Sequence, residues 1–311
     1  MDDLPFPDRD LFNYKDMLKK FAGRAEGLYI AEIMTGRGCP FECTYCCNHA
    51  LRKTYEGLGN YVRRRSVDNV MAEIEQLVNE YDINWLVFDD DTFTIHPKWI
   101  EEFCEKYRNK FSITFQCNAF PTTLKPNIVR MLKEAGCSRV TVGIESGNEW
   151  LRQEVLKRPI TNDQLIASFK LLSEYGIEGY SFNMVGFPYE TAEMLEDTCN
   201  LNRLLNPNHI QVSIFYPYPG TELYKTCLNN GWLSENGKSS YFAEGTVLNL
   251  PNLTEDQINR YFRKLHSLSI DKIVRSSYPN IYWFYNFSKR ILGESINYRM
   301  SILARRLLYH Y

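Results

Sequence analysis

The sequence lacks the features that would place it in a membrane or on a polyanion. It has no run of about 18 apolar residues, so we expect no transmembrane helix. It starts with the acidic segment Met1-Asp2-Asp3 and no apolar stretch, so we expect no secretory signal. The chain has 36 Lys and Arg residues and 38 Asp and Glu residues, which give a formal net charge of −2. Without a basic excess to displace counterions, general binding of nucleic acid is not expected.

Further absences narrow the class of protein. No Gly-x-Gly-x-x-Gly motif follows the first predicted strand, which argues against a dinucleotide-binding sheet. No second Cys-x-x-Cys pair is present, whereas a structural zinc site usually needs two separated pairs. The nine cysteines are an odd number in a long chain without a signal, which argues against a disulfide framework. Metal binding or catalysis is therefore the better explanation for them.

What the chain does contain is a regular alternation of elements. Short runs rich in β-branched and aromatic residues predict six strands, at residues 29–35, 85–89, 112–118, 139–143, 180–185 and 211–216. Stretches with apolar residues at helical spacing lie between them. Six strand–helix units predict an α/β fold with parallel strands, either an open sheet or a partial barrel. Both place a functional site at the carboxyl ends of the strands.

Composition outside this region suggests three parts. We divide the chain into a lead-in, a core barrel and a helical C-terminal extension, at residues 1–27, 28–230 and 231–311. The lead-in holds Pro5 and Pro7, which favour an extended, non-helical segment. The extension contains a Thr-x-x-Gln capping pattern that begins at Thr254 and predicts a helix.

The end of the extension is basic and aromatic. From Lys272 onward, seven Lys and Arg residues accompany one acidic residue, Glu294. One hypothesis is docking to a membrane surface, which would suit a lipid-like substrate and a peripheral location. The alternative is a helix that closes the open side of the barrel.

Three cysteines cluster in the loop after the first predicted strand. Cys39, Cys43 and Cys46 have the spacing Cys-x-x-x-Cys-x-x-Cys, which lets several thiolates converge on one centre. Thiolates favour zinc, copper(I) or iron–sulfur clusters. A cubane cluster usually takes four cysteines, so three would leave one iron open to a small molecule. The adjacent Cys47 is not expected to be a ligand.

This cluster, with Tyr45 just before its last cysteine, resembles the signature of the radical S-adenosylmethionine (SAM) superfamily. The resemblance implies a partial (β/α)6 TIM-like barrel, a [4Fe–4S] cluster on Cys39, Cys43 and Cys46, and SAM on the open iron near Tyr45. It implies reductive cleavage of SAM to a 5′-deoxyadenosyl radical that abstracts hydrogen from an organic substrate. It also implies an electron donor such as flavodoxin or ferredoxin. Because such a cluster is oxygen-sensitive, a reducing cytoplasm is the expected location.

The same resemblance implies further SAM contacts at two strand ends. Asp89, Asp90 and Asp91 follow the second strand, where the family holds the SAM amino group. Carboxylates suit that role because they accept charge-assisted hydrogen bonds, although a solvated acidic loop is the alternative. Glu145 and Ser146 stand in a Gly-Ile-Glu-Ser motif after the fourth strand and would contact the ribose or methionine portion of SAM.

Three more residues have two open interpretations each. Glu190, in Gly-x-Pro-x-Glu-Thr after the fifth strand, is either a SAM contact or a carboxylate at a helix N-terminus. Arg65, the last of three consecutive arginines, either meets the SAM carboxylate or belongs to a solvated basic patch. Cys117, near the end of the third strand, either faces the site as a candidate catalytic residue or packs in the core.

Several motifs resemble the cobalamin-dependent subgroup of this superfamily. These are the acidic Asp-Asp-x-Phe form after the second strand, the Gly-Ile-Glu-Ser motif, and a lead-in similar to that subgroup's interdomain linker. No Asp-x-His-x-x-Gly motif is present, so we interpret the chain as such a barrel without the N-terminal cobalamin-binding domain. One alternative is a cobalamin-assisted methyltransferase or cyclase whose cobalamin comes from another domain or chain. The others are a non-catalytic iron–sulfur or SAM-binding protein and a structural zinc protein.

Overall fold

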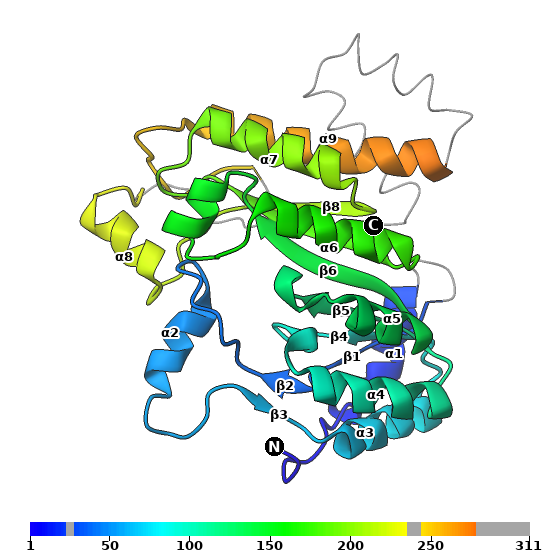
Figure 1. The fold of residues 1–311 in the computed structure, drawn as a ribbon. Coiled ribbons are helices and arrows are strands. Elements are labelled where there is room, and N and C mark those ends of the chain that lie inside the picture. Colours follow the sequence, from blue (N-terminus) through cyan, green and yellow to red (C-terminus); the bar gives the residue numbers. More distant parts are fainter. Residues whose placement is uncertain (23–27, 235–243, 278–311) are drawn as a thin grey trace.

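The computed structural model of the chain describes residues 1–22, 28–234 and 244–277. Its centre is a parallel sheet in which each strand pairs with the next along the chain. The sheet curls into a partial barrel with helices along its outer side, which confirms the predicted α/β fold (Figure 1). The six strands are β1 (Ile30–Ile33), β4 (Trp85–Phe88), β5 (Thr114–Ala119), β6 (Cys137–Glu145), β7 (Glu178–Val185) and β8 (His209–Ile214).

The helices of the outer layer follow the sheet strand by strand. They are α3 (Val67–Glu80), α4 (Pro97–Lys110), α5 (Pro126–Glu134), α6 (Asn162–Glu174), α7 (Ala192–Leu205) and α9 (Glu255–Ser277). Two short helices, α2 (Cys47–Thr54) and α8 (Glu222–Asn229), lie beyond the carboxyl ends of the strands (Figure 1). A small antiparallel ribbon, β2 (Gly36–Arg37) with β3 (Arg63–Arg64), flanks the first crossover.

Polar side chains fix where several of these helices begin. The Thr161 hydroxyl accepts a hydrogen bond from the Gln164 N–H, and the Gln164 side chain accepts one from the Thr161 N–H, which together form a capping box. Ser66, Thr191 and Thr221 cap α3, α7 and α8 through their hydroxyl groups in the same way. These caps fix the residue at which each loop from the carboxyl edge of the sheet ends and its helix begins.

An aromatic cluster forms the core between the sheet and α4. Phe88, Phe103, Tyr107 and Phe115 are fully buried, together with Phe93 in the loop after β4. Phe88 meets the rings of Phe103 and Phe115 edge to face at 5.3 and 5.4 Å. Such pairs add about 0.5–1.5 kcal/mol each to the area that they bury. This core anchors the strand ends that carry the acidic loop.

The lead-in is not wholly extended as we expected. A single 3₁₀ turn, Asp10–Phe12, leads into helix α1 (Tyr14–Ala22). The two prolines precede this segment and constrain only the residues near them. Asn13 takes a left-handed conformation, with φ of 50°, at the junction. The prolines therefore do not prevent a helix that starts seven residues after Pro7.

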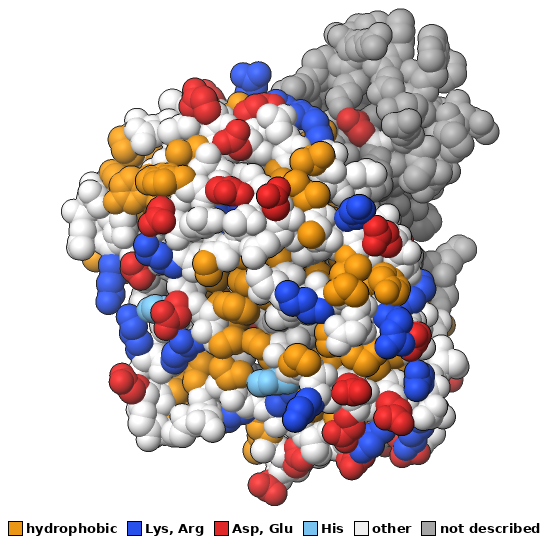
Figure 2. All heavy atoms as spheres, in the orientation of Figure 1, with side chains coloured by type: hydrophobic (Ala, Val, Ile, Leu, Met, Phe, Trp, Pro, Cys, Tyr) orange, Lys and Arg blue, Asp and Glu red, His pale blue; other side chains and the backbone are white. Residues whose placement is uncertain are grey.

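The last described helix, α9, packs along β8. Its buried residues Ile258, Phe262 and Leu265 join Val185 and Val212 of the sheet in one apolar cluster. Among the described helices, none combines the length and the apolar character needed to cross a bilayer. The face in Figure 2 carries basic and acidic side chains intermingled. The basic aromatic tail, residues 278–311, lies outside the described residues, so both hypotheses about it stay predictions.

Candidate functional site

The cysteine loop lies at the carboxyl edge of the sheet, between β2 and α2. Cys39 and Cys46 are half-buried, Cys43 is 6% exposed, and Cys47 is exposed at the start of α2. Arg52 of α2 reaches back and donates to the Cys39 carbonyl at 2.5 Å. This contact ties the start of the loop to the helix that ends it.

Thr44 anchors the middle of the loop to the rest of the molecule. Its N–H donates to the Leu156 carbonyl at 3.1 Å, and its hydroxyl donates to the Val155 carbonyl at 2.7 Å. Its own carbonyl accepts from the Leu223 N–H of α8 at 3.1 Å. The loop is thus fixed both to the turn after β6 and to α8.

Each of the three cysteine sulfurs has its own polar neighbour. Cys39 Sγ lies 4.0 Å from the Thr92 hydroxyl, and Cys46 Sγ accepts from the Asn48 amide at 3.8 Å. Cys43 Sγ accepts from Nη1 of Arg158 at 3.8 Å. Burial raises the pKa of the Cys39 thiol and raises the pKa of Cys46 to about 12. Without a metal, Cys39 and Cys46 therefore stay protonated at neutral pH.

The donor set of this loop is three thiols, which suit an iron–sulfur cluster. In residues 1–22, 28–234 and 244–277, no three His, Cys, Asp or Glu side chains gather so as to hold one metal ion. A structural zinc needs its ligands to converge on one point. A cubane assigns a separate iron to each cysteine, so its ligands stand apart. Three half-buried or buried thiols on one anchored loop, each with its own polar neighbour, suit a cluster that takes one iron per cysteine.

Tyr45, Glu145 and Arg158 form a buried network next to Cys43. Glu145 accepts a hydrogen bond from the Tyr45 hydroxyl. Burial raises the pKa of the Glu145 carboxyl, while Arg158 and the Tyr45 hydrogen bond oppose that shift. Burial would lower the pKa of Arg158, but Tyr45, Glu145 and Cys43 together raise it above its ordinary value. The structure thus brings together Tyr45 and Glu145, which the resemblance assigns to SAM binding, and that role stays a prediction.

The backbone at the end of β6 is shaped for this network. Glu145 takes a left-handed conformation, with φ of 67°, which is rare for a residue other than glycine. A Cβ at Gly143 would meet the Glu145 carboxylate and would lie 3.0 Å from Nη2 of Arg158. Gly143 therefore leaves the space that the two charged groups occupy. Strain of this kind, worth about 1–3 kcal/mol, is typical of functional sites.

The three predicted aspartates point to different partners. Asp90 is buried and accepts from the Thr35 N–H and hydroxyl at 3.1 and 2.9 Å. Asp91 accepts from the Asn48 amide at 2.7 Å. Asp89 has no hydrogen-bond donor in the described part of the chain, and burial, with nearby Glu32 and Asp90, raises its pKa to about 6. Asp90 is therefore the most fully engaged of the three, and the roles of all three toward SAM stay predictions.

Two other predicted contacts have polar partners within the protein. The Ser146 hydroxyl is buried and accepts from the Asn148 N–H at 3.2 Å. Arg65 contacts Glu73 at 2.5 Å and also donates to Asn69, on the outer side of the sheet. Their roles toward SAM stay predictions, but both side chains are already engaged.

Glu190 stands just before Thr191, the N-cap of α7, but its carboxylate binds the preceding loop and not the first turn of the helix. Its role toward SAM stays a prediction. One Glu190 oxygen accepts from the N–H groups of Gly186 and Phe187 at 2.7 and 3.1 Å, and the other has no partner among the described residues. Cys117 is 1% exposed and belongs to the core between the sheet and the outer helices. The predicted catalytic candidate therefore faces away from the loop of Cys39.

Sequence reasoning missed a polar chain that supports the cysteine loop. The Tyr61 hydroxyl donates to the side-chain oxygen Oδ1 of Asn48 at 2.6 Å, and the side-chain NH₂ of Asn48 donates to both Asp91 and Cys46. Neither residue stands in a motif, and no pattern in the sequence identifies either of them. They come together because the ribbon of β2 and β3 brings the end of the crossover back to α2.

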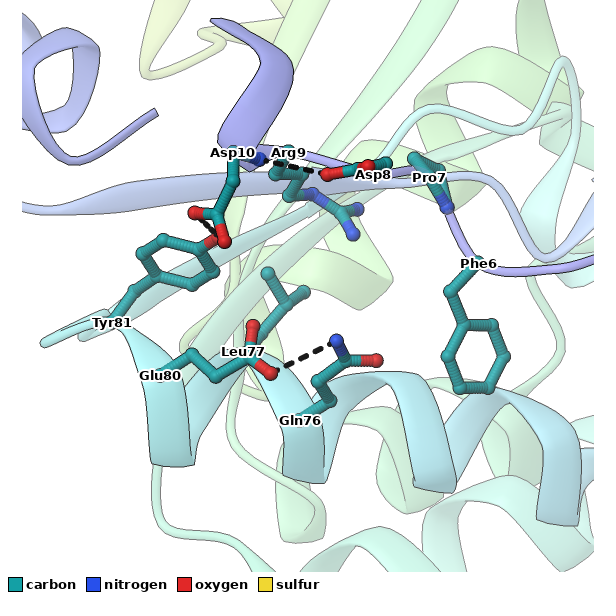
Figure 3. A pocket seen from close by; sticks show the side chains of 9 residues that line it. All are labelled: Phe6, Pro7, Asp8, Arg9, Asp10, Gln76, Leu77, Glu80 and Tyr81. Carbon is teal, nitrogen blue, oxygen red and sulfur yellow. Dashed lines mark hydrogen bonds between the residues drawn. The ribbon is translucent and has the colours of Figure 1, made fainter. Parts of the chain in front are cut away.

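A cavity of about 310 Å³ lies away from this site, between the lead-in and α3 (Figure 3). Tyr81 donates to Asp10 across it at 3.0 Å, and Gln76 donates to Glu80 at 3.0 Å. Tyr81 precedes β4, so this cavity lies toward the amino ends of the strands. Its polar groups are satisfied by one another, and we assign no role to it.

Sequence comparison finds curated proteins that are similar to this chain. An uncharacterized methyltransferase of Pyrococcus horikoshii is 30% identical over 267 residues, which are 86% of this chain and 55% of that protein. An anaerobic magnesium-protoporphyrin IX monomethyl ester cyclase of Rubrivivax gelatinosus is 29% identical over 192 residues, 61% of this chain and 33% of that protein. The chain thus spans about half or less of the length of these relatives.

Solved structures share the fold. The radical SAM methyltransferase TsrM of Kitasatospora setae, with cobalamin and a [4Fe–4S] cluster bound, superposes with a TM-score of 0.58. The sequence identity is 18%, over 78% of this chain and 48% of that one. The model of the radical SAM superfamily matches residues 33–201, which include the cysteine loop and the ends of β4, β6 and β7. The chain therefore belongs to the radical SAM superfamily.

Proposed function

We propose that this chain is a radical SAM enzyme that acts on a small organic substrate. The observation that carries the proposal is the anchored loop of Cys39, Cys43 and Cys46 at the carboxyl edge of a partial barrel. A reduced [4Fe–4S] cluster held there would supply the electron that cleaves SAM to a hydrogen-abstracting 5′-deoxyadenosyl radical. The protein supplies binding, orientation and exclusion of water.

The residues around the loop suit the charges that SAM carries. Asp89, at the end of β4, has no side-chain donor among the described residues and would accept the SAM ammonium, since carboxylates form strong charge-assisted bonds with cations. Glu145 is buried beside Tyr45 and would meet the ribose hydroxyls. Tyr45 packs on an apolar cluster that includes Phe187, with the two ring centroids 5.8 Å apart. Such an environment keeps water from a reactive radical.

The test is anaerobic reconstitution of the full chain with iron and sulfide. Wild type should bind the cluster, seen by iron content and electron paramagnetic resonance, and should form 5′-deoxyadenosine from SAM with dithionite as reductant. Replacing Cys39, Cys43 or Cys46 by Ala should lower that product by about 100-fold or more, since even outer partners of metal ligands are worth about 10- to 100-fold.

Cys47→Ala is the matched control. Cys47 adjoins Cys46 but is exposed on α2, so its loss should leave both cluster content and product unchanged. A wild-type protein that binds the cluster and forms no 5′-deoxyadenosine would favour a non-catalytic iron–sulfur protein. Equal loss in Cys47→Ala would contradict the assignment of the three ligands.

Cobalamin-assisted methyl transfer is a second candidate function. It is favoured by the similarity to a methyltransferase of Pyrococcus horikoshii and by the fold shared with TsrM, which binds cobalamin. Cobalamin would then come from another domain or chain. The fate of the labelled SAM methyl group in the same assay separates the two candidates.

Flavodoxin or ferredoxin would replace dithionite as the physiological reductant. A lipid-like substrate would require the tail to bind vesicles.

A further inference from the structure

Arg158 is a fully enclosed cation that touches one of the predicted cluster ligands. It is 7% exposed, and its Nη1 donates to Cys43 Sγ at 3.8 Å. Its Nη2 donates to the Gly143 carbonyl at 2.7 Å, which fixes the guanidinium at the end of β6. Its Nε is buried and has no hydrogen-bond partner in the described residues. Burying a charge with one donor unsatisfied costs folding free energy, so this arrangement needs a functional explanation.

Aromatic rings hold the guanidinium plane in place. Arg158 lies over the ring of Phe120, 4.4 Å from its centroid. Phe120 in turn stacks on Phe41, inside the cysteine loop, with centroids 3.5 Å apart. The guanidinium and the loop are therefore linked twice, through the Cys43 sulfur and through the two rings. Rotation of Arg158 away from Cys43 would break both links.

We propose that Arg158, by donating to the Cys43 sulfur, raises the reduction potential of the cluster that this loop holds. The proposal rests on the proposed function and makes Arg158 a positioning residue for cluster reduction. One electron from the reductant converts [4Fe–4S]²⁺ to [4Fe–4S]⁺, and no bond or proton changes place. The added negative charge is stabilised by a buried cation and by a hydrogen bond to a ligand sulfur.

Glu145 sets the limit of this effect. It is buried beside Arg158 and, to the extent that it is ionised, neutralises part of the same positive charge. Gly143 and the left-handed backbone of Glu145 allow both groups to fit against the loop. The strain at Glu145 therefore has a use, because relaxing it would change the charge that Cys43 faces.

The test is a redox titration of the reconstituted full chain without SAM, followed by electron paramagnetic resonance of [4Fe–4S]⁺. Arg158→Gln should lower the ratio of reduced to oxidised cluster about tenfold at a fixed solution potential, equivalent to about 59 mV for one electron. Arg158→Lys keeps the charge without the planar fork and should give an intermediate ratio. Lys157→Gln is the matched control, since Lys157 is the neighbouring cation but 52% exposed.

Every outcome bears on the proposal. A wild-type ratio in a cluster-loaded Arg158→Gln protein overturns it, as does an equal shift in Lys157→Gln. If Arg158→Gln binds no cluster, Arg158→Lys decides, and a lowered ratio there supports the proposal. Failure of both variants to bind the cluster overturns tuning and leaves Arg158 a structural residue. Because SAM is absent, a protein that cannot cleave SAM would contradict the proposed function without affecting this result.

Discussion

Glu190 shows how the fold can control the charge of a single side chain. It is 1% exposed, and only one of its oxygens has hydrogen-bond donors among the described residues. Burial raises the pKa of its carboxyl from 4.5 to about 8, against the opposing effect of the Phe187 and Gly186 N–H groups. At neutral pH the folded protein therefore keeps a proton that the unfolded chain releases.

We expect the free energy of unfolding to fall as pH rises from 4.5 to about 8. A raised carboxyl pKa stabilises the folded state fully below the unfolded pKa, and that stability is lost as pH rises through the folded pKa. The slope from this group is at most about 1.4 kcal/mol per pH unit. Urea unfolding at a series of pH values should show it.

Glu190→Gln should flatten this dependence, because the amide has no proton to lose in that range. Its carbonyl oxygen can still accept from Gly186 and Phe187. Glu193→Gln, exposed in the first turn of α7, is the control and should keep the wild-type slope. An unchanged slope in Glu190→Gln would mean that Glu190 is ionised in the folded protein.

The limit of sequence reasoning is clearest at Lys157 and Arg158. The two adjacent basic residues offer equal candidates for an inward contact, and nothing in their identity separates them. The structure buries Arg158 against Cys43 and exposes Lys157, which takes a left-handed conformation with φ of 49°. The backbone of the preceding turn decides which side chain points inward, and that geometry has no signature in the sequence.

At the scale of elements, the strands were predictable because they are buried. Their runs of apolar residues, such as Trp85–Phe88, are typical of parallel strands covered by helices. The short π-helical turn Leu151–Val155 was not predictable. Buried Arg152 holds this turn by donating to the backbone carbonyls of Ser146 and Ile160. These contacts are near in the chain, but no periodic pattern in the sequence indicates them. The ribbon of β2 and β3 is likewise too short for a periodic signal.

The capping box of α6 gives a prediction at this scale. Thr161→Ala removes the hydroxyl that accepts from Gln164 and should lower the free energy of unfolding by about 1 kcal/mol. Thr161→Ser keeps that acceptor and should restore most of the loss. Urea unfolding of the three proteins at one pH measures both effects. Equal stability of the Ala and Ser variants would mean that the hydroxyl bond contributes nothing.

At the scale of the molecule, the cysteine loop packs largely apart from the central strands and meets the main core at its edge, where Phe41 stacks on Phe120. The aromatic core of Phe88 and its neighbours lies on the outer side of the sheet. Tyr45 instead packs on a smaller apolar cluster that includes Phe187 and Leu223. Whatever the cysteine loop binds should therefore stabilise its own surroundings much more than the central strands.

Removing the cluster with an iron chelator tests this separation. In the apo protein we expect faster hydrogen exchange in residues 38–54 and unchanged exchange in β4, β5 and β6. The reason is that a bound group stabilises the segments that it contacts, and only those segments open locally without it. Cys47→Ala, loaded and stripped in the same way, should behave as wild type. Faster exchange throughout the central strands would contradict the separation.

The order of the sheet also has a consequence for synthesis. Every strand of the six-stranded sheet pairs with the strand of that sheet made before it. The sheet can therefore assemble from β4 onward as the chain leaves the ribosome. The first crossover, residues 34–84, is the longest in the sheet and carries the three predicted ligand cysteines. Its end is fixed only once β4 is available. Delivery of iron and sulfide must then follow translation of about the first third of the chain, and the thiols must stay reduced until that moment.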